Sequence, residues 1–381
     1  MTERTKDEMN EIYRGRRKKA AAYLTENNFA AAVFIDSESH RDPAVPYLTG
    51  HPSDAVLILF SSGQTVLVPW DEILAKKSAF YDKMIPYTRF RCSDTDAVKS
   101  VLNSSEQQAK KRIELPPYLT YPNFLKFVDA LSEYDVRCRE HGAHEFVTEM
   151  RMVKDEYEIE CTKEAARIGD IIIGMIEEQI KSGEIRTETD VALLIERECR
   201  KYGCQRTGFD TLAAGPSRSF AIHAFPNYTS APWPGKGLSI LDFGVVYNGY
   251  TSDTTVTVAS GELTAEQERQ LSLVQKAYDE CLPLYRDGIP VKEAAERADA
   301  IFAAAKRRMP HTLGHAVGLE IHEQPRISSR SAADIKFKAG MIVTLEPGLY
   351  DETTGGCRLE NDVLITEEGN EVISHSRVIR I

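Results

Sequence analysis

The pattern of apolar and polar positions along the N-terminal third of the chain predicts short strands that alternate with helices. Residues 30–35, 55–60 and 65–68 form brief apolar runs with the length and the β-branched content of buried strands. A basic stretch over 13–27, compatible with a helix, precedes them. We therefore expect an α/β domain that ends near residue 147.

Beyond this boundary the pattern changes, because apolar residues recur at helical spacing with charges between them. Two helices followed by strands are predicted twice. The expected segments are 155–181, 189–202 and 239–258 in the first half, and 265–285, 291–308 and 341–365 in the second. The halves share little residue identity, so the repeat is one of architecture. It would place carboxylates from each half on opposite sides of one cleft.

The composition, 42% apolar and 28% charged over 381 residues, is that of a globular protein long enough for two domains. A net charge of −11 gives little electrostatic reason to bind nucleic acid. The polar N-terminus and the short apolar runs predict neither a signal peptide nor a membrane span. Seven dispersed cysteines without Cys-x-x-Cys spacing favour a cytoplasmic protein.

The segment 241–255 predicts a β-hairpin that carries two aspartates. Its turn would be Asn248-Gly249, which suits a two-residue loop because both central positions need positive φ. The resulting register pairs Tyr247 with Tyr250, Gly244 with Asp253 and Asp242 with Thr255. Both aspartates then lie on one face of the sheet, where their carboxylates can converge. The alternative is that they merely flank a solvated turn.

Three further ionisable residues lie in apolar or glycine-rich stretches, where a charge is costly unless a partner neutralises it. They are His315 in Leu-Gly-His-Ala-Val-Gly, Glu346 in Val-Thr-Leu-Glu-Pro-Gly, and Glu360 in Gly-Gly-Cys-Arg-Leu-Glu. Four converging carboxylates would repel one another, and two divalent cations would compensate them. One imidazole with oxygen ligands suits manganese, cobalt, zinc or iron. We predict a dinuclear centre, with metals about 3.5–4 Å apart, that activates a bridging water as hydroxide.

At these residues the chain resembles the pita-bread metallopeptidases of family M24, in particular the branch of prolidases and Xaa-Pro aminopeptidases. The five candidate ligands follow the family's order, and residues 151–159 are similar to its Arg-x-x-Lys-x-x-x-Glu-Ile motif, as 47–50 (Tyr-Leu-Thr-Gly) are to a motif of its N-terminal domain. The resemblance implies an α/β (α+β) fold. A creatinase/prolidase-like mixed-sheet domain over 1–147 would precede a pita-bread catalytic domain over 148–381 with a pseudo-two-fold internal repeat.

The resemblance also implies a role for each ligand. Five residues would hold the two metals: Asp242, Asp253, His315, Glu346 and Glu360. Asp253 and Glu360 would bridge the metals. Glu346 would also act in catalysis, as the group that carries a proton from the attacking water to the leaving nitrogen.

Four residues around the ligands take their roles from the same resemblance. His223 and His322 would bind substrate and stabilise the oxyanion in catalysis. Thr255 and Arg358 would orient the ligands from behind. Taken singly, each histidine more often has a structural role. Asn361 departs from the family, whose members often carry an aspartate there.

Arg326 decides the expected substrate class. It is similar to the prolidase arginine that receives the free carboxylate of a dipeptide, onto which a guanidinium forks in two parallel hydrogen bonds. The alternative is that it pairs with a surface acid. We therefore expect metal-dependent hydrolysis of Xaa-Pro dipeptides. The nearest alternative is an Xaa-Pro aminopeptidase acting on longer peptides; more distant ones are a non-peptide hydrolase or lyase of the same fold and an inactive protein-binding module.

The family resemblance further implies a homodimer, since prolidases draw substrate contacts from the neighbouring subunit's N-terminal domain. His40 and His51 are the candidates for such a contact in this chain. Glu346 follows His315 by 31 positions, a little more than in many members of the family, so the sequence does not predict the loop between them.

Overall fold

In the computed structural model, which describes residues 4–105 and 111–381, the chain divides between Met150 and Arg151 into two units. The sequence pattern placed this boundary near residue 147. Helix α6 (Ala143–Met152) spans the division. No helix among the described residues combines the length and the apolar character needed to cross a membrane.

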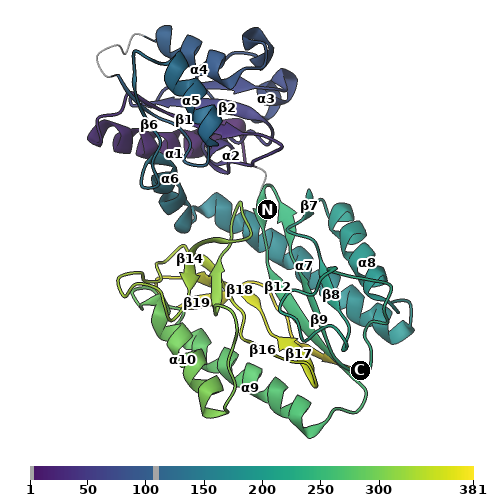
Figure 1. The fold of residues 1–381 in the computed structure, drawn as a ribbon. Coiled ribbons are helices and arrows are strands. Elements are labelled where there is room, and N and C mark those ends of the chain that lie inside the picture. Colours follow the sequence, from purple (N-terminus) through teal and green to yellow (C-terminus); the bar gives the residue numbers. More distant parts are fainter. Residues whose placement is uncertain (1–3, 106–110) are drawn as a thin grey trace. The chain divides into compact units, whose positions relative to one another are not determined.

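The first unit is built on a six-stranded mixed sheet with the order β4-β3-β2-β1-β5-β6 (purple to blue in Figure 1). The pairs β1–β2 and β2–β3 are antiparallel, and the other three pairs are parallel. Its strands are β1 (Ala31–Asp36), β2 (Ala55–Phe60), β3 (Thr65–Pro69), β4 (Lys83–Met84), β5 (Arg112–Glu114) and β6 (Asp135–Arg137). Its helices are α1 (Lys6–Glu26), α2 (Ala44–Thr49), α3 (Glu72–Ser78), α4 (Asp94–Asn103) and α5 (Tyr121–Ala130), with the 3-10 turn η1 (Tyr87–Phe90). The three apolar runs seen in the sequence are thus confirmed as β1, β2 and β3.

Helix α1 begins earlier than the apolar pattern indicated. It starts at Lys6, because the side chain of Thr5 accepts a hydrogen bond from the Glu8 amide while the Glu8 carboxylate accepts one from the Thr5 amide. This reciprocal capping satisfies amides that would otherwise lack partners. The first turns carry few apolar residues, so the hydrophobic pattern alone could not reveal them.

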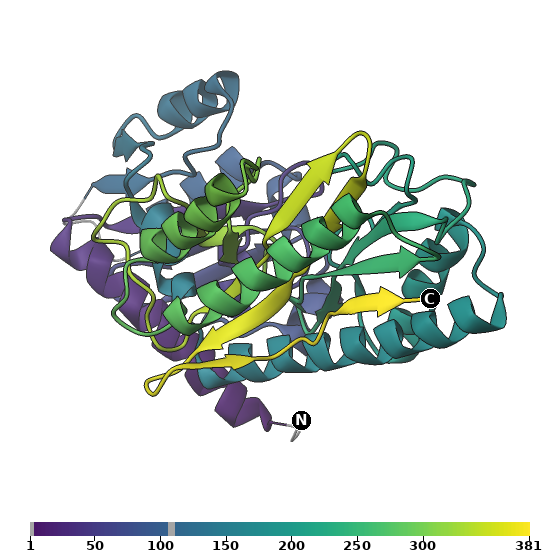
Figure 2. The same ribbon diagram turned by 90° about the horizontal axis from the view of Figure 1, so that it is seen from below.

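The second unit confirms the predicted repeat of two helices followed by strands (Figures 1 and 2). The first half contains α7 (Glu156–Ser182), α8 (Glu188–Lys201), β7 (Arg206–Thr207), β8 (Leu212–Ala214), β9 (Gly237–Phe243), β10 (Val245–Tyr247), β11 (Tyr250–Thr251) and β12 (Thr254–Ser260). The second half contains α9 (Ala265–Cys281), η2 (Leu282–Leu284), α10 (Val291–Ala304), β13 (Gly314–Ala316), β14 (Glu323–Ile327), β15 (Ile342–Leu345), β16 (Gly348–Asp351), β17 (Gly355–Arg358), β18 (Asn361–Ile365), β19 (Asn370–Val372) and β20 (Val378–Arg380).

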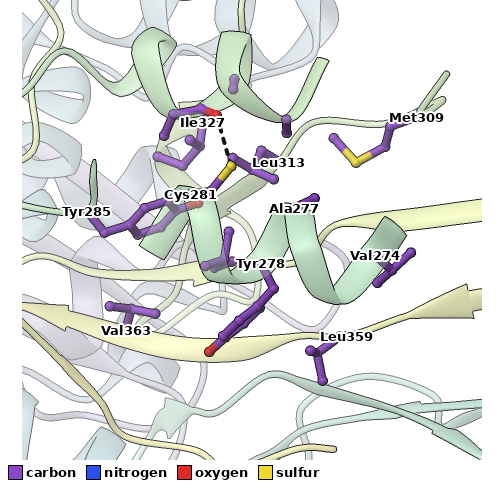
Figure 3. Packing of buried hydrophobic residues seen from close by; sticks show 14 of the residues in the cluster. Val274, Ala277, Tyr278, Cys281, Tyr285, Met309, Leu313, Ile327, Leu359 and Val363 are labelled. Carbon is purple, nitrogen blue, oxygen red and sulfur yellow. Dashed lines mark hydrogen bonds between the residues drawn. The ribbon is translucent and has the colours of Figure 1, made fainter. Parts of the chain in front are cut away.

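Each half buries its helix pair against its own strands. In the first half, isoleucines of α7 and α8 pack on β9 and β12. In the second half, one face of α9 packs on the strands, as Figure 3 shows for Val274, Tyr278, Leu359 and Val363. The apolar helix spacing read from the sequence therefore marks the faces that cover the curved sheets of a pita-bread fold.

The predicted hairpin is present in the expected register. Asn248 and Gly249 both adopt positive φ, 47° and 89°, as their turn requires. Tyr247 pairs with Tyr250, and Asp242 pairs with Thr255. Gly244 and Asp253 fall in the gap between the two paired segments rather than in a ladder. The parallel pairing of β12 with β20 joins the strands of the two halves, and so does a β-bridge between Thr255 and Glu360.

Candidate metal centre

The five predicted ligands come from both halves of the second unit and line one cavity of about 530 Å³. Their positions are Asp242 in β9, Asp253 just before β12, His315 in β13, Glu346 just after β15, and Glu360 between β17 and β18. All four carboxylates are largely buried; we call them the acid cluster. The repeat therefore brings together side chains more than 100 residues apart in sequence, as the pattern of the two halves led us to expect.

His315 presents a free lone pair to the acid cluster. Its Nδ1 lies 3.1 Å from the carbonyl oxygen of Ala316, to which it donates, so Nε2 carries no proton in the neutral ring. Nε2 lies 3.6 Å from Asp253 Oδ2 and 3.5 Å from Glu346 Oε1. Burial lowers the pKa of His315 to about 3, so the ring is neutral. A neutral imidazole oriented in this way can donate to a metal ion.

The acid cluster is electrostatically incomplete without cations. Burial, and then the neighbouring carboxylates, raise the pKa of Asp253 and of Glu346 well above their usual values, and raise that of Glu360 to about 7. Within the described residues, one oxygen of Asp242 and one of Asp253 are buried without a hydrogen-bond partner. Asp253, His315 and Glu360 each offer an atom within 4.8 Å of the others. Oxygen-rich, unsatisfied and negatively charged, this donor set fits divalent cations.

Arg358 and Thr255 contact the candidate ligands from behind. The Arg358 guanidinium is almost fully buried; it donates to a carboxylate oxygen of Asp242 and, through Nε, to Thr255 Oγ1 at 2.9 Å. Thr255 Oγ1 in turn donates to Glu360 Oε2 at 2.5 Å. One chain of hydrogen bonds thus connects Asp242 of the first half with Glu360 of the second, which fixes the direction of both carboxylates.

The remaining predicted residues lie on the wall of the same cavity. His223, His322 and Arg326 all line it, and all three are exposed. The ring of His322 lies 4.4 Å from that of His315, centroid to centroid. Among the residues that the structure describes, Arg326 forms no ion pair with an acid, so the surface-pairing alternative has no partner there. A free guanidinium on a cavity wall can receive an anionic group of a ligand.

The comparison with known families agrees with this geometry. The model of metallopeptidase family M24 matches residues 160–367, which contain all five candidate ligands. The chain belongs to metallopeptidase family M24. An uncharacterized peptidase of Staphylococcus haemolyticus is 31% identical over 86% of this chain and 91% of its own length. An uncharacterized peptidase of Methanocaldococcus jannaschii is 32% identical over 67% of this chain and 70% of its own length.

Solved structures confirm the pita-bread fold of this M24 member. An X-Pro aminopeptidase from Thermotoga maritima superposes with a TM-score of 0.83 at 26% identity, covering 96% of this chain and 99% of that one. The prolidase from Pyrococcus horikoshii gives a TM-score of 0.82 at 24% identity, with the same coverage, and shows the likeness in fold alone. The predicted family and fold are thereby confirmed, and the chain is a metallopeptidase.

In this M24 peptidase, sequence reasoning overlooked His311. Its Nδ1 donates to the carbonyl oxygen of Thr312 at 2.8 Å, and its Nε2 accepts from the Tyr350 hydroxyl at 3.0 Å. Nδ1 also lies 3.6 Å from Glu346 Oε2. Burial, and then Arg358, lower the pKa of His311 to about 4, so the ring is neutral. Its position four residues before His315, in the same glycine-containing stretch, was the signal that could have found it.

Asp362 was also missed. Its buried carboxylate accepts the backbone amide of Asp253 at 2.9 Å, while its second oxygen has no partner within the described residues. Asn361, the position noted as a departure, instead donates to the Tyr278 hydroxyl and accepts from the Ser376 amide. The aspartate that supports the candidate ligand therefore stands one residue further along the chain.

Proposed function

We propose that this M24 metallopeptidase hydrolyses the bond between an N-terminal residue and proline, and that its preferred substrates are Xaa-Pro dipeptides. The observation that supports this choice is Arg326, an exposed guanidinium without an acidic partner among the described residues, on the wall of the cavity that holds the acid cluster. In a dipeptide the free carboxylate is one residue from the bond that breaks. A charged anchor near the reacting carbonyl therefore favours dipeptides.

We assign two divalent ions, manganese, cobalt, zinc or iron, to Asp242, Asp253, His315, Glu346 and Glu360. When bound, such ions lower the pKa of water to make it a nucleophile at neutral pH, and they polarise the carbonyl under attack. The need for ions is supported by the buried carboxylate oxygens without partners among the described residues and by the raised pKa values of Asp253, Glu346 and Glu360.

The chain's own groups supply the proton transfers and the binding. Glu346 would take the proton from the attacking water and deliver it to the leaving proline nitrogen, a role that a carboxylate close to the reacting atoms can fill. His322 and His223 would donate hydrogen bonds to the carbonyl oxygen as negative charge develops on it. His311, held by Thr312 and Tyr350, would form the wall of the site beside the Glu346 carboxylate.

The decisive experiment compares Ala-Pro with Ala-Pro-Ala-Ala in the wild type and in Arg326→Ala, after loading with manganese. A hydrogen-bonded ion pair contributes about 1.5–3 kcal/mol, so KM for Ala-Pro should rise at least ~10-fold in the variant. KM for the tetrapeptide should change far less, because its carboxylate lies two residues further away. Arg330→Ala is the control, since Arg330 is an exposed arginine four residues further along that does not line the cavity.

The second candidate function is that of an Xaa-Pro aminopeptidase acting on longer peptides, which the likeness to the Thermotoga maritima structure favours. Faster cleavage of Ala-Pro-Ala-Ala than of Ala-Pro, with equal effects of Arg326→Ala on both, would support it instead. Metal analysis of the same preparations tests for two ions per chain.

The homodimer remains a prediction that size-exclusion chromatography would test. His51 is fully buried within the first unit and His40 is exposed, so only His40 is available for a contact with another subunit.

A further inference from the structure

The segment that carries His322 has no regular structure of its own. Residues 317–322 connect β13 to β14, and the register between these strands shifts between His315 and Ala316. Within the described residues, three backbone hydrogen bonds hold this loop: the Val317 amide donates to Ile342 O at 3.2 Å, the Thr251 amide to Gly318 O at 2.8 Å, and the Gly318 amide to Glu320 O at 3.1 Å. A loop with so few internal bonds keeps one shape only if side chains from elsewhere fix it.

A buried carboxylate supports the loop from inside. Glu323, the first residue of β14, has a side chain only 4% exposed, and its Oε1 accepts the Glu320 amide at 3.3 Å. A Cβ on Gly318 would lie 2.5 Å from the same oxygen, so the loop backbone packs directly on this carboxylate. A movement of the Glu323 side chain would therefore displace the loop backbone at Gly318 and at Glu320.

Two buried cations hold that carboxylate. Arg151 donates to Glu323 Oε1 at 2.5 Å, and Lys154 Nζ lies 3.2 Å from Oε2. Their side chains are 4% and 0% exposed. The Lys154 amide also donates to Gly340 O at 2.9 Å, which anchors the lysine to the turn before β15. Burial alone would raise the pKa of Glu323, but Arg151 and Lys154 outweigh it and hold the value at about 2. The carboxylate thus stays ionised at neutral pH.

We propose that Arg151, Lys154 and Glu323, which we call the Glu323 clamp, are positioning residues that fix the 317–322 loop and so aim the His322 imidazole at the substrate carbonyl. None of the three lines the cavity. They act through His322, the last residue of the loop, which directly precedes Glu323. The proposal rests on the role given to His322 in the proposed function.

A double-mutant cycle between Glu323→Gln and His322→Ala tests the coupling. Groups that orient a functional residue typically change activity about 10–100-fold, so Glu323→Gln should lower kcat for Ala-Pro by at least about 10-fold while KM and the bound metal stay nearly unchanged. In the His322→Ala background the same change should cause little further loss. Equal losses in both backgrounds would overturn the proposal.

Glu323→Gln leaves two buried cations facing a neutral amide, which could prevent folding. A second variant with a milder change therefore tests the clamp as well. Lys154→Met keeps the Arg151–Glu323 pair, so its kcat should fall less than that of Glu323→Gln. Lys154→Arg, which keeps the positive charge, should recover the kcat of the wild type. The matched control is Lys163→Met, which removes the surface pair between Lys163 and Glu371. A kcat loss in the control equal to that in Lys154→Met would contradict a specific clamp.

An NMR measurement tests the Glu323 clamp independently of enzyme activity. The imidazole signal of His322, identified by its absence in His322→Ala, should shift or broaden in Lys154→Met and stay in place in Lys163→Met. An unchanged signal in Lys154→Met would refute the clamp. If His322→Ala leaves Xaa-Pro turnover intact, the role of His322 in the proposed function fails, and the NMR result still judges the clamp separately.

Discussion

Glu360 and Glu323 are both buried carboxylates of the second unit, yet their pKa values move in opposite directions. Burial and the neighbouring Asp242 raise the pKa of Glu360 to about 7. Burial acts on Glu323 in the same direction, but Arg151 and Lys154 reverse the outcome and lower its pKa to about 2. Since both side chains are buried, the charges around each carboxylate determine the direction in which its pKa shifts.

The two surroundings differ in whether the chain neutralises itself. The Glu323 clamp places two cations on one buried carboxylate, so it is complete without any ligand. The acid cluster has four carboxylates, and Arg358, the one buried arginine or lysine that pairs with them among the described residues, contacts Asp242 and Glu360. Several buried carboxylates destabilise a protein unless cations bind from the solvent and neutralise them. The first arrangement is a scaffold and the second is a binding site.

The largest expected effect comes from removing one member of the acid cluster. Asp253→Asn should abolish turnover of Ala-Pro and reduce the bound metal, because a neutral amide replaces a carboxylate to which we assign the cations. Elemental analysis and an activity assay on the same sample measure both. Asp299→Asn, at an exposed position of α10, is the control. Full metal content in Asp253→Asn would show that the acid cluster does not depend on Asp253 for its cations.

The second-largest expected effect is on the free energy of unfolding, which should distinguish the Glu323 clamp from the acid cluster when the metal is removed. Glu323→Gln should lower the free energy of unfolding by about 3–5 kcal/mol with or without metal, because it strands two buried cations. Asp253→Asn should instead stabilise the metal-free protein, because it removes one of four repelling carboxylates, and destabilise the metal-loaded one by weakening binding. Urea unfolding with and without a chelator measures both. A metal-free Asp253→Asn that is as unstable as Glu323→Gln would contradict the comparison.

The pH dependence of the Glu323 contribution follows from its lowered pKa. A folded value of about 2, below the usual 4.5, gives stability that is fully present above pH 4.5 and is lost as the pH falls toward 2. The whole contribution is on the order of 3 kcal/mol, and roughly 1 kcal/mol of it should be gone at pH 3.5. The measured quantity is the difference in unfolding free energy between the wild type and Glu323→Gln, from which effects of the acid cluster cancel. A difference that stays constant from pH 7 to 3.5 would argue against the ion pairs.

The sequence predicted the parts of this fold that depend on local pattern. The hairpin register that pairs Asp242 with Thr255 followed from the turn residues, since a two-residue turn leaves one way to align its strands. The apolar spacing of α7 and α9 predicted their buried faces. The convergence of five distant ligands followed from the need to compensate charges in apolar stretches and from the resemblance to family M24.

Contacts between distant charged residues were not predictable in the same way. Arg151 was read as part of a family motif, but its partner Glu323 lies 172 residues away, and no periodicity tells which buried charges meet. The same holds for Asp362, whose contact is the backbone amide of Asp253, 109 residues distant. Hydrophobic pattern indicates which face is buried; it carries no information on which polar groups pair inside.

Arg358→Met is expected to lower turnover less than Asp253→Asn does, and it examines the one arginine that pairs with the acid cluster among the described residues. Its guanidinium orients Asp242 and Thr255 at once, so the variant should lose about 10–100-fold in kcat, equivalent to about 1.4–2.7 kcal/mol. Metal stoichiometry should be retained, since the cluster becomes more negative and attracts cations at least as strongly. Kinetics under metal saturation, together with elemental analysis, measure the two quantities. The contrary outcome is that metal-loaded Arg358→Met unfolds as readily as Glu323→Gln. Arg358 would then neutralise the acid cluster as Arg151 and Lys154 neutralise Glu323. The distinction between a binding site and a scaffold would fail.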